Sequence, residues 1–162
     1  AVCKVLSVLA EPLKKIRRQE GAVLEADLKL RINMILSLLN DVTPFEAERF
    51  VRMRERLRSN FDEALGKDNF DQNRFEQEVL YYLEKMDMSE EKSRLEQHCK
   101  YFLEQMEHKK DAVGRTLNFI SQEIGREINT LGAKAYDSDI QRVVVQMKDE
   151  LEKIKEQLAN VL

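Results

Sequence analysis

The chain has 162 residues, enough to bury the core of one domain, and no shift in composition divides it into two. Charged residues make up 35% of it, against only 5 Gly and 2 Pro, which favours long solvated helices and leaves few residues for the turns of an all-β protein. The formal net charge of -3 excludes a uniformly basic surface. Any nucleic-acid site must therefore be a local patch.

Cysteine usage and hydropathy indicate the compartment. Cys3 and Cys99 form no CxxC pair and no disulfide pattern, which fits a reducing environment. No apolar run approaches membrane-spanning length, and the first residues lack the layout of a signal peptide. We therefore predict a cytoplasmic protein without membrane contact. Because the sequence starts without Met and already in helical register, we expect a further N-terminal part before it.

The first half of the chain is expected to form two helices, because its apolar residues recur at steps of three and four. The first helix is predicted to end near Asn40. A second is predicted to start at Thr43, because a capping hydroxyl followed by Pro44 and then Glu46 is typical of a helix N-terminus. This second helix should end around Gly66, a residue common after the last helical turn.

The second half is expected to hold four more helices. One begins after Asp71, and the next is predicted to start with Ser89 as its cap. A break near residues 109–114 precedes the third, and residues 132–137 form the loop before the last. Between Ile140 and Val161 the apolar residues alternate steps of four and three, which is typical of a coiled-coil seam.

The predicted fold is all-α, with several long amphipathic helices in an elongated bundle that forms a single domain over residues 1–162. Its terminal helices are coiled-coil-like, and their narrow apolar stripes must be covered by a helix of the same chain or of a neighbouring subunit. We expect self-association through the last helix. A coiled-coil adaptor for another protein is a third interpretation, favoured only if the terminal stripes stay exposed.

Polar residues on one predicted helix face form the first candidate site. Glu91, Arg94 and His98 step by three and four residues, so an acid, a base and an imidazole share a face. The simpler interpretation is an ion pair of Glu91 with Arg94 and a histidine bonded to a neighbouring carbonyl group. Spacing alone favours that interpretation.

Two carboxylates form the second candidate site. Glu123 and Glu127 are four residues apart, and two acids so placed can share a hard cation such as Mg²⁺ or Mn²⁺. Side chains suited to phosphate oxygens lie on an adjacent face: Arg115, Gln122, Arg126 and Asn129. The alternative is a solvent-exposed helix in which Glu123 pairs with Arg126.

A third candidate is the arginine-rich string ERFVRMRERLR, the best predicted surface for an RNA backbone because guanidinium groups suit phosphate. Its arginines are Arg49, Arg52, Arg54, Arg56 and Arg58. A solvated helix face is the simpler alternative.

Three strings in the sequence resemble the C-terminal half of the YicC/YloC family of bacterial endoribonucleases. They are NRFEQEVLYYLEKMDMSEEKSRLEQHCKYFLEQM, AVGRTLNFISQEIGREINTLGAKAYD and MKDELEKIKEQLANVL. The QExxREINTLGxK core within the second is specific to that family, and the likeness runs from the RRQEG segment to the last residue. Asn118 departs from the family pattern, which has an aspartate there, and this puts a metal-ligand role for the position in doubt.

The resemblance implies a cytoplasmic endoribonuclease that depends on a divalent metal ion, Mn²⁺ or Mg²⁺, and cleaves single-stranded RNA as a homo-oligomer, a ring-like hexamer. It also implies an N-terminal α/β domain, of which this chain would be the helical C-terminal partner. We therefore expect His98, Glu123 and Glu127 to hold the metal ion and act as the catalytic centre. The residues expected to bind RNA are Arg94, Arg115, Gln122, Arg126, Asn129 and Lys134.

The competing interpretation is a non-catalytic helical scaffold for oligomerisation or RNA binding that supports the N-terminal domain. The placement of His98, Glu123 and Glu127 distinguishes the two. A shared polar cleft favours chemistry, whereas separate exposed faces favour the scaffold.

Overall fold

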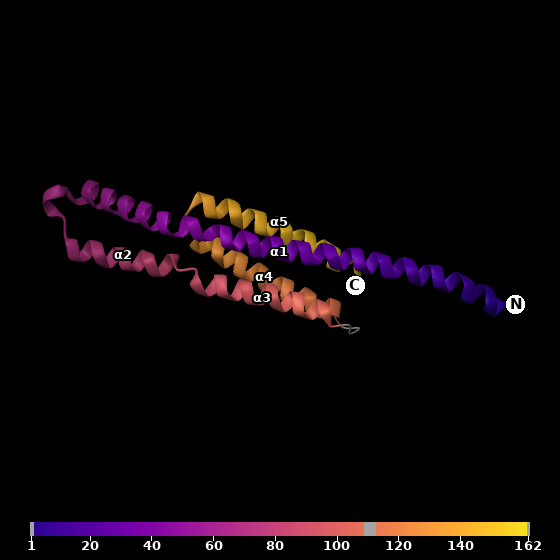
Figure 1. Ribbon diagram of the computed structural model, residues 1–162. Coiled ribbons are helices and arrows are strands. Elements are labelled where there is room, and N and C mark those ends of the chain that lie inside the picture. The colour runs from indigo at the N-terminus through magenta and orange to yellow at the C-terminus, as the bar shows by residue number, and fades with distance from the viewer. Residues whose placement is uncertain (1, 109–112, 162) are drawn as a thin grey trace.

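The computed structural model describes residues 2–108 and 113–161, and every α-helix or 3-10 element in these ranges is shown in Figure 1. The elements are α1 (Val2–Leu65), a 3-10 turn η1 (Lys67–Asn69), α2 (Gln72–Met86), α3 (Ser89–Glu107), α4 (Val113–Lys134) and α5 (Ser138–Val161). The described residues contain no strand, so the predicted all-α class is confirmed. No described helix is both long and apolar enough to cross a bilayer.

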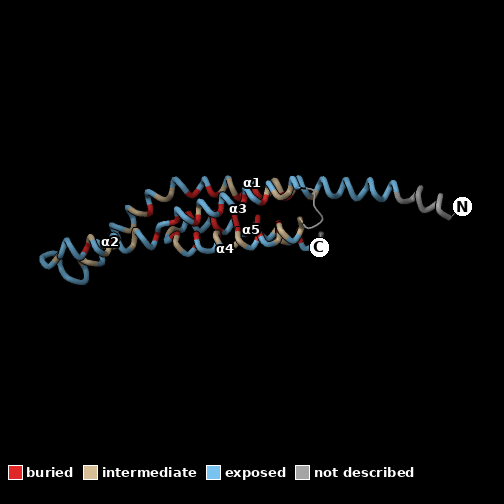
Figure 2. The backbone as a smooth tube through the Cα atoms, turned by 90° about the horizontal axis from the view of Figure 1, so that it is seen from below, coloured by how far each residue is buried: buried red, intermediate tan, exposed pale blue. Residues whose placement is uncertain are grey.

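Helices α1, α3, α4 and α5 form an elongated bundle in which each helix packs on two antiparallel neighbours (Figure 1). α1 packs on α3 and α5, and α4 packs on the same two helices from the other side. α2 turns back along the C-terminal part of α1 and leads into α3. The N-terminal part of α1 extends beyond the bundle, and residues 11–22 of this helix are exposed to solvent (Figure 2).

One apolar core runs along the centre of the bundle, visible as buried positions on the facing sides of the helices in Figure 2. The largest buried side chains in it are Ile32, Ile35, Met88, Leu95, Phe102, Ile124, Ile128, Leu131, Ile140 and Met147. A smaller aromatic cluster closes the hairpin between α1 and α2, where the Phe75 ring lies 5.7 Å from Phe61 and 5.3 Å from Phe70. Burial of these side chains is the main force that holds the helices together.

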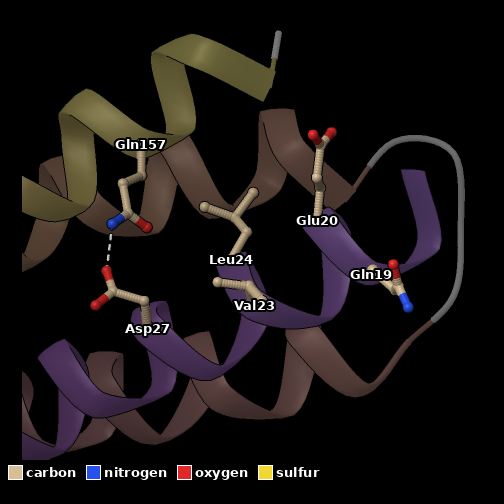
Figure 3. A pocket seen from close by; sticks show the side chains of 6 residues that line it. All are labelled: Gln19, Glu20, Val23, Leu24, Asp27 and Gln157. Atoms are coloured by element: carbon tan, nitrogen blue, oxygen red, sulfur yellow. Dashed lines mark hydrogen bonds between the residues drawn. The ribbon is translucent and has the colours of Figure 1, made fainter. Parts of the chain in front are cut away.

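Polar contacts also join α1 to α5. Gln157 donates a hydrogen bond to the carboxylate of Asp27, as Figure 3 shows beside Val23 and Leu24. Closer to the centre of the bundle, Arg31 donates to Glu150 at 3.0 Å. Both pairs join residues more than a hundred positions apart, so they fix the alignment of the last helix along the first.

The predicted break before Thr43 is wrong, because α1 continues through Pro44 without interruption. The proline ring removes a hydrogen bond to the carbonyl of Asn40, but both residues face solvent, where water can bond the freed oxygen. Leu39 and Val42 lie on the opposite side and are buried in the core. Packing of that face outweighs the local capping signal.

Ser89 is not the cap of α3 but its first helical residue. The carboxylate of Asp87 accepts hydrogen bonds from the backbone N–H and the hydroxyl of Ser89, which lowers the pKa of Asp87. Asp71 accepts from the backbone N–H groups of Asn73 and Arg74 at the start of α2, as an N-cap residue should. Asp71 is thus the N-cap of α2, whereas Met88 is the N-cap of α3 without a side-chain hydrogen bond and Asp87, one residue earlier, binds Ser89.

The apolar seam of α5 is buried within its own chain, so it provides no argument for self-association. Ile140, Met147 and Leu158 face α1 and α4 in the core. Of the two covers that the periodicity left open, the structure shows a helix of the same chain, and self-association itself stays a prediction. Several apolar residues of α1 stay exposed, among them Leu13 at 60% and Ile16 at 50%.

The buried thiol of Cys99 gives a direct test of this core. Burial, and to a smaller extent the charge of Glu96, raise the pKa of the Cys99 thiol to about 12. At pH 8 only about one thiol in ten thousand is then ionised, and the thiolate is the reactive form. In a Cys3→Ser variant, we expect Ellman's reagent to modify Cys99 at least about a thousandfold more slowly in the native than in the urea-unfolded protein. Equal rates would contradict the packing.

Candidate functional site

The polar site lies on the hairpin of α3 and α4, and a buried ion pair fixes how the two helices align. Glu91 on α3 is only 5% exposed. Its carboxylate accepts from the ammonium group of Lys134 on α4 at 2.7 Å, while its second oxygen has no hydrogen-bond partner. Because the two helices are antiparallel, this pair sets the level of every other residue along the hairpin.

His98 and Glu127 lie at one level of the hairpin. His98 is seven residues after Glu91, and Glu127 is seven residues before Lys134. Seven residues are about two helical turns, so each returns to the face of its helix that carries the ion pair. Both side chains are half-buried, and neither forms a hydrogen bond or ion pair with a described residue. An imidazole and a carboxylate in this position are free to exchange protons with a bound ligand.

Glu123, the third predicted ligand, lies one helical turn from Glu127 and already has a partner. Its carboxylate pairs with Arg126 at 2.9 Å, and both side chains are exposed. Ion pairing of Glu123 with Arg126 was the alternative that the sequence left open. The three predicted residues thus share one side of the hairpin, but only His98 and Glu127 are unpaired.

The described residues do not form a complete metal site, because no three His, Cys, Asp or Glu side chains among them are placed to hold one ion. At most two such side chains of the described residues can therefore bind the same cation. The three-ligand arrangement of His98, Glu123 and Glu127 is therefore not preassembled here.

The predicted RNA-binding residues divide into exposed and paired groups. Arg115, Gln122 and Asn129 are exposed on α4. Arg94 pairs with Glu90 rather than with Glu91, so the predicted pair of Glu91 with Arg94 is wrong: Glu91 turns toward α4 while Arg94 faces solvent.

The arginine-rich segment of α1 has a mainly structural role. Arg49 is 2% exposed and donates to the backbone oxygens of Lys134 at 3.0 Å and Ala135 at 2.9 Å. It also donates to the carbonyl oxygen of Met86. Burial lowers the pKa of this guanidinium. Position 49 follows the buried Val42 by seven residues, a spacing that could have revealed its burial from the sequence.

The remaining arginines of this segment differ in their partners. Arg52 pairs with Asp137 after α4, and Arg54 pairs with Glu76 on α2 at 2.6 Å. Arg58 lies over the ring of Phe70 at 5.1 Å. Arg56 alone among the five forms no hydrogen bond, ion pair or ring contact within the described residues.

Comparison with known proteins gives one consistent result. The family model described as "Endoribonuclease YicC-like, C-terminal" matches residues 42–162. A protein named "Probable endoribonuclease YicC" from Clostridioides difficile is 34% identical over 150 residues, which cover 92% of this chain and 51% of that protein. One of the same name from Haemophilus influenzae is 34% identical over 146 residues, covering 90% and 50%. The chain therefore spans about half the length of the curated relatives it matches.

Removing one partner of the buried ion pair should cost stability, which distinguishes Lys134 from a surface RNA contact. We expect Lys134→Met to lower the free energy of unfolding by about 2 kcal/mol. Breaking a fully buried ion pair costs roughly 3–5 kcal/mol, and the expected loss is smaller here because part of the Lys134 side chain is exposed to solvent. Urea unfolding measures this change. Glu91→Leu added to Lys134→Met should restore most of the loss, and Arg115→Ala should change stability by less than about 0.5 kcal/mol. A double variant as unstable as the sum of both single variants would contradict the pairing.

Proposed function

Because this chain belongs to the YicC-like endoribonuclease family, we propose that the full-length protein cleaves single-stranded RNA at internal phosphodiester bonds. One observation assigns the reaction to particular residues. His98 and Glu127 lie at the same height along the α3–α4 hairpin, and neither has a hydrogen-bond or ion-pair partner among the described residues. Two relatives bear the name of a probable endoribonuclease, which supports the reaction class. RNA is accordingly the proposed partner, and the cytoplasm the proposed location.

The proposed chemistry assigns proton transfer to this pair. One of the two groups accepts the proton of the attacking hydroxyl or water, and the other donates a proton to the oxygen that leaves the phosphorus. Such transfer by a positioned side chain contributes about a hundred- to ten-thousandfold to a rate. Arg115 and Gln122 are exposed on the same helix, N-terminal to Glu127, and would contact phosphate oxygens to that side of the cleaved bond.

Dependence on Mn²⁺ or Mg²⁺ is part of the proposal. Its support is the unpaired carboxylate of Glu127, since carboxylate oxygen is a preferred ligand of both ions. His98 and Glu127 would be the protein donors. Glu123 could join them only after release from Arg126. When bound, the ion would supply positive charge at the phosphate.

Assembly into a homo-oligomer, a hexamer, is also proposed. With the seam of α5 buried, its support lies in the projecting part of α1. There Leu13, Ile16 and Val23 are exposed at positions three and seven residues apart, which suits packing against another helix.

A scaffold without catalysis is the second candidate, favoured by the ion pairs. Arg94, Arg126 and Lys134 each have a carboxylate partner, as residues that only stabilise helices would. In this case the chain would support RNA cleavage by other parts of the protein. His98 and Glu127 would then be dispensable.

Cleavage of a labelled single-stranded RNA by the full-length protein separates these candidates. We expect cleavage in Mn²⁺ that stops in EDTA, and a rate about a hundredfold or more lower for Glu127→Gln and for His98→Gln. Circular dichroism should show an unchanged helical content. Glu156→Gln, which alters an exposed carboxylate of α5, is the matched control and should keep the wild-type rate. Wild-type cleavage by both site variants would show that the centre is wrong and favour the scaffold.

A further inference from the structure

A groove of about 290 Å³ lies where α1, α2 and the turn between α4 and α5 meet. It is lined by Met53, Arg56, Leu57 and Asn60 of α1, Tyr82 of α2, and Tyr136 of the turn. Polar and apolar side chains both line it, and its volume is at the lower limit for small-molecule sites. We propose that this groove binds one nucleotide of a single-stranded RNA, with the base stacked on a tyrosine ring and the phosphate held by Arg56.

Tyr136 is held in an unusual conformation that keeps its ring at the surface. Its φ is 48°, a left-handed value that bulky L-residues rarely adopt, and it is 58% exposed. More than half of this aromatic side chain therefore meets solvent. A strained residue that persists at the surface points to a ligand that it serves.

Two arginines of α1 hold the turn on both sides of Tyr136. Arg49 bonds the carbonyl oxygens of the two preceding residues, at 3.0 Å and 2.9 Å. Arg52 pairs with the carboxylate of Asp137, the next residue along. Asp137 also caps α5 by accepting from the backbone N–H of Ile140 at 3.0 Å. The ring of Tyr136 is thus positioned in advance, and little ordering is needed when a base stacks on it.

The positive charge in the groove is available to a ligand. Arg56 and Asn60 are exposed and form no hydrogen bond, ion pair or ring contact within the described residues. None of the six lining residues carries a carboxylate. Lys85 adds a second cation nearby, with its ammonium group 4.7 Å from the centre of the Tyr81 ring. Its pKa is raised, chiefly by its hydrogen bond to Tyr81.

This combination suits single-stranded nucleic acid better than other ligands of the same size. Aromatic faces stack on any base, and arginine binds phosphate and can also stack on a base. The groove is distinct from His98 and Glu127, because Glu127 lies seven residues before Lys134, about 10 Å along the helix axis. This proposal rests on the proposed function, because both assume that the protein binds RNA. Binding of RNA in the groove can nevertheless occur without cleavage.

Fluorescence anisotropy of a labelled twelve-residue oligoadenylate RNA, measured with the full-length protein in EDTA, tests the groove without cleavage. We expect Tyr136→Gly to raise Kd about 5- to 100-fold, in line with the loss of one stacked base. Glycine accepts a positive φ, so the thermal unfolding temperature should not fall. Tyr136→Phe keeps the ring and should keep the wild-type Kd. Arg56→Gln should raise Kd and reduce the slope of log K against log salt by about one.

The matched control is Tyr101→Ala, which removes an exposed tyrosine of α3 outside the groove and should leave Kd unchanged. Unchanged Kd values for both Tyr136→Gly and Arg56→Gln would overturn the proposal, as would a wild-type protein that binds no RNA. If these variants instead lose self-association in light scattering and keep their Kd, the groove is an interface between copies and the proposal is wrong. RNA that binds through Tyr136 but is never cleaved in Mn²⁺ would support the groove and contradict the proposed function alone.

Discussion

The buried guanidinium of Arg49 is the interaction on which the arrangement of the helices depends. It joins the centre of α1 to the last residue of α2, Met86, and to the end of α4 at Lys134 and Ala135. Carbonyl groups at a helix C-terminus lack partners within the helix and carry partial negative charge, so one cation serves two helix ends. No carboxylate contacts this guanidinium among the described residues. Its hydrogen bonds go mainly to backbone oxygens, and the sulfur of Met88 and the ring of Phe50, 5.0 Å away, also contact it. Removing it would leave several buried acceptors unsatisfied.

The candidate sites follow from this arrangement. The end of α4 is fixed by Arg49, and one residue of that end, Lys134, forms the buried pair with Glu91. That pair aligns α3 with α4 and brings His98 and Glu127 to one level of the hairpin. The same fixed end leads into the turn that presents Tyr136 to the groove. A proposed catalytic pair and a proposed nucleotide site thus depend on one scaffold.

Periodicity predicted the helices well and their partners poorly. The steps of three and four residues identified α2, α3, α4 and α5, because an amphipathic stripe is a local property of the sequence. The continuity of α1 through Pro44 was missed, although the buried stripe of Leu39 and Val42 crosses that region without a change of phase. The cover of the α5 seam was left open between the same chain and a partner subunit, because a stripe does not identify the chain that covers it. Packing between distant segments decided both cases.

The sites were predictable only within single helices. Spacing placed Glu91 with His98 and Glu123 with Glu127, but the alignment of α3 on α4 depends on the contact between Glu91 and Lys134, which no spacing reveals. Arg49 was grouped with phosphate-binding arginines because its charge suggested exposure, whereas its position on the buried stripe indicated the opposite. Tyr136 had no sequence signal, since its role depends on a backbone angle and on residues of two other helices.

Hydrogen–deuterium exchange of an Arg49→Lys variant tests most directly whether this guanidinium holds the end of α4. In the wild-type protein the amides of Ala135, Ile140 and Gln141 are hydrogen-bonded within the turn and should exchange slowly. Lysine keeps the charge but cannot reach three carbonyl groups in the same geometry. We predict exchange at least about tenfold faster at these amides, with unchanged protection near Leu151 in the core of α5. Wild-type protection at the turn, or an equal loss along every helix, would contradict the account.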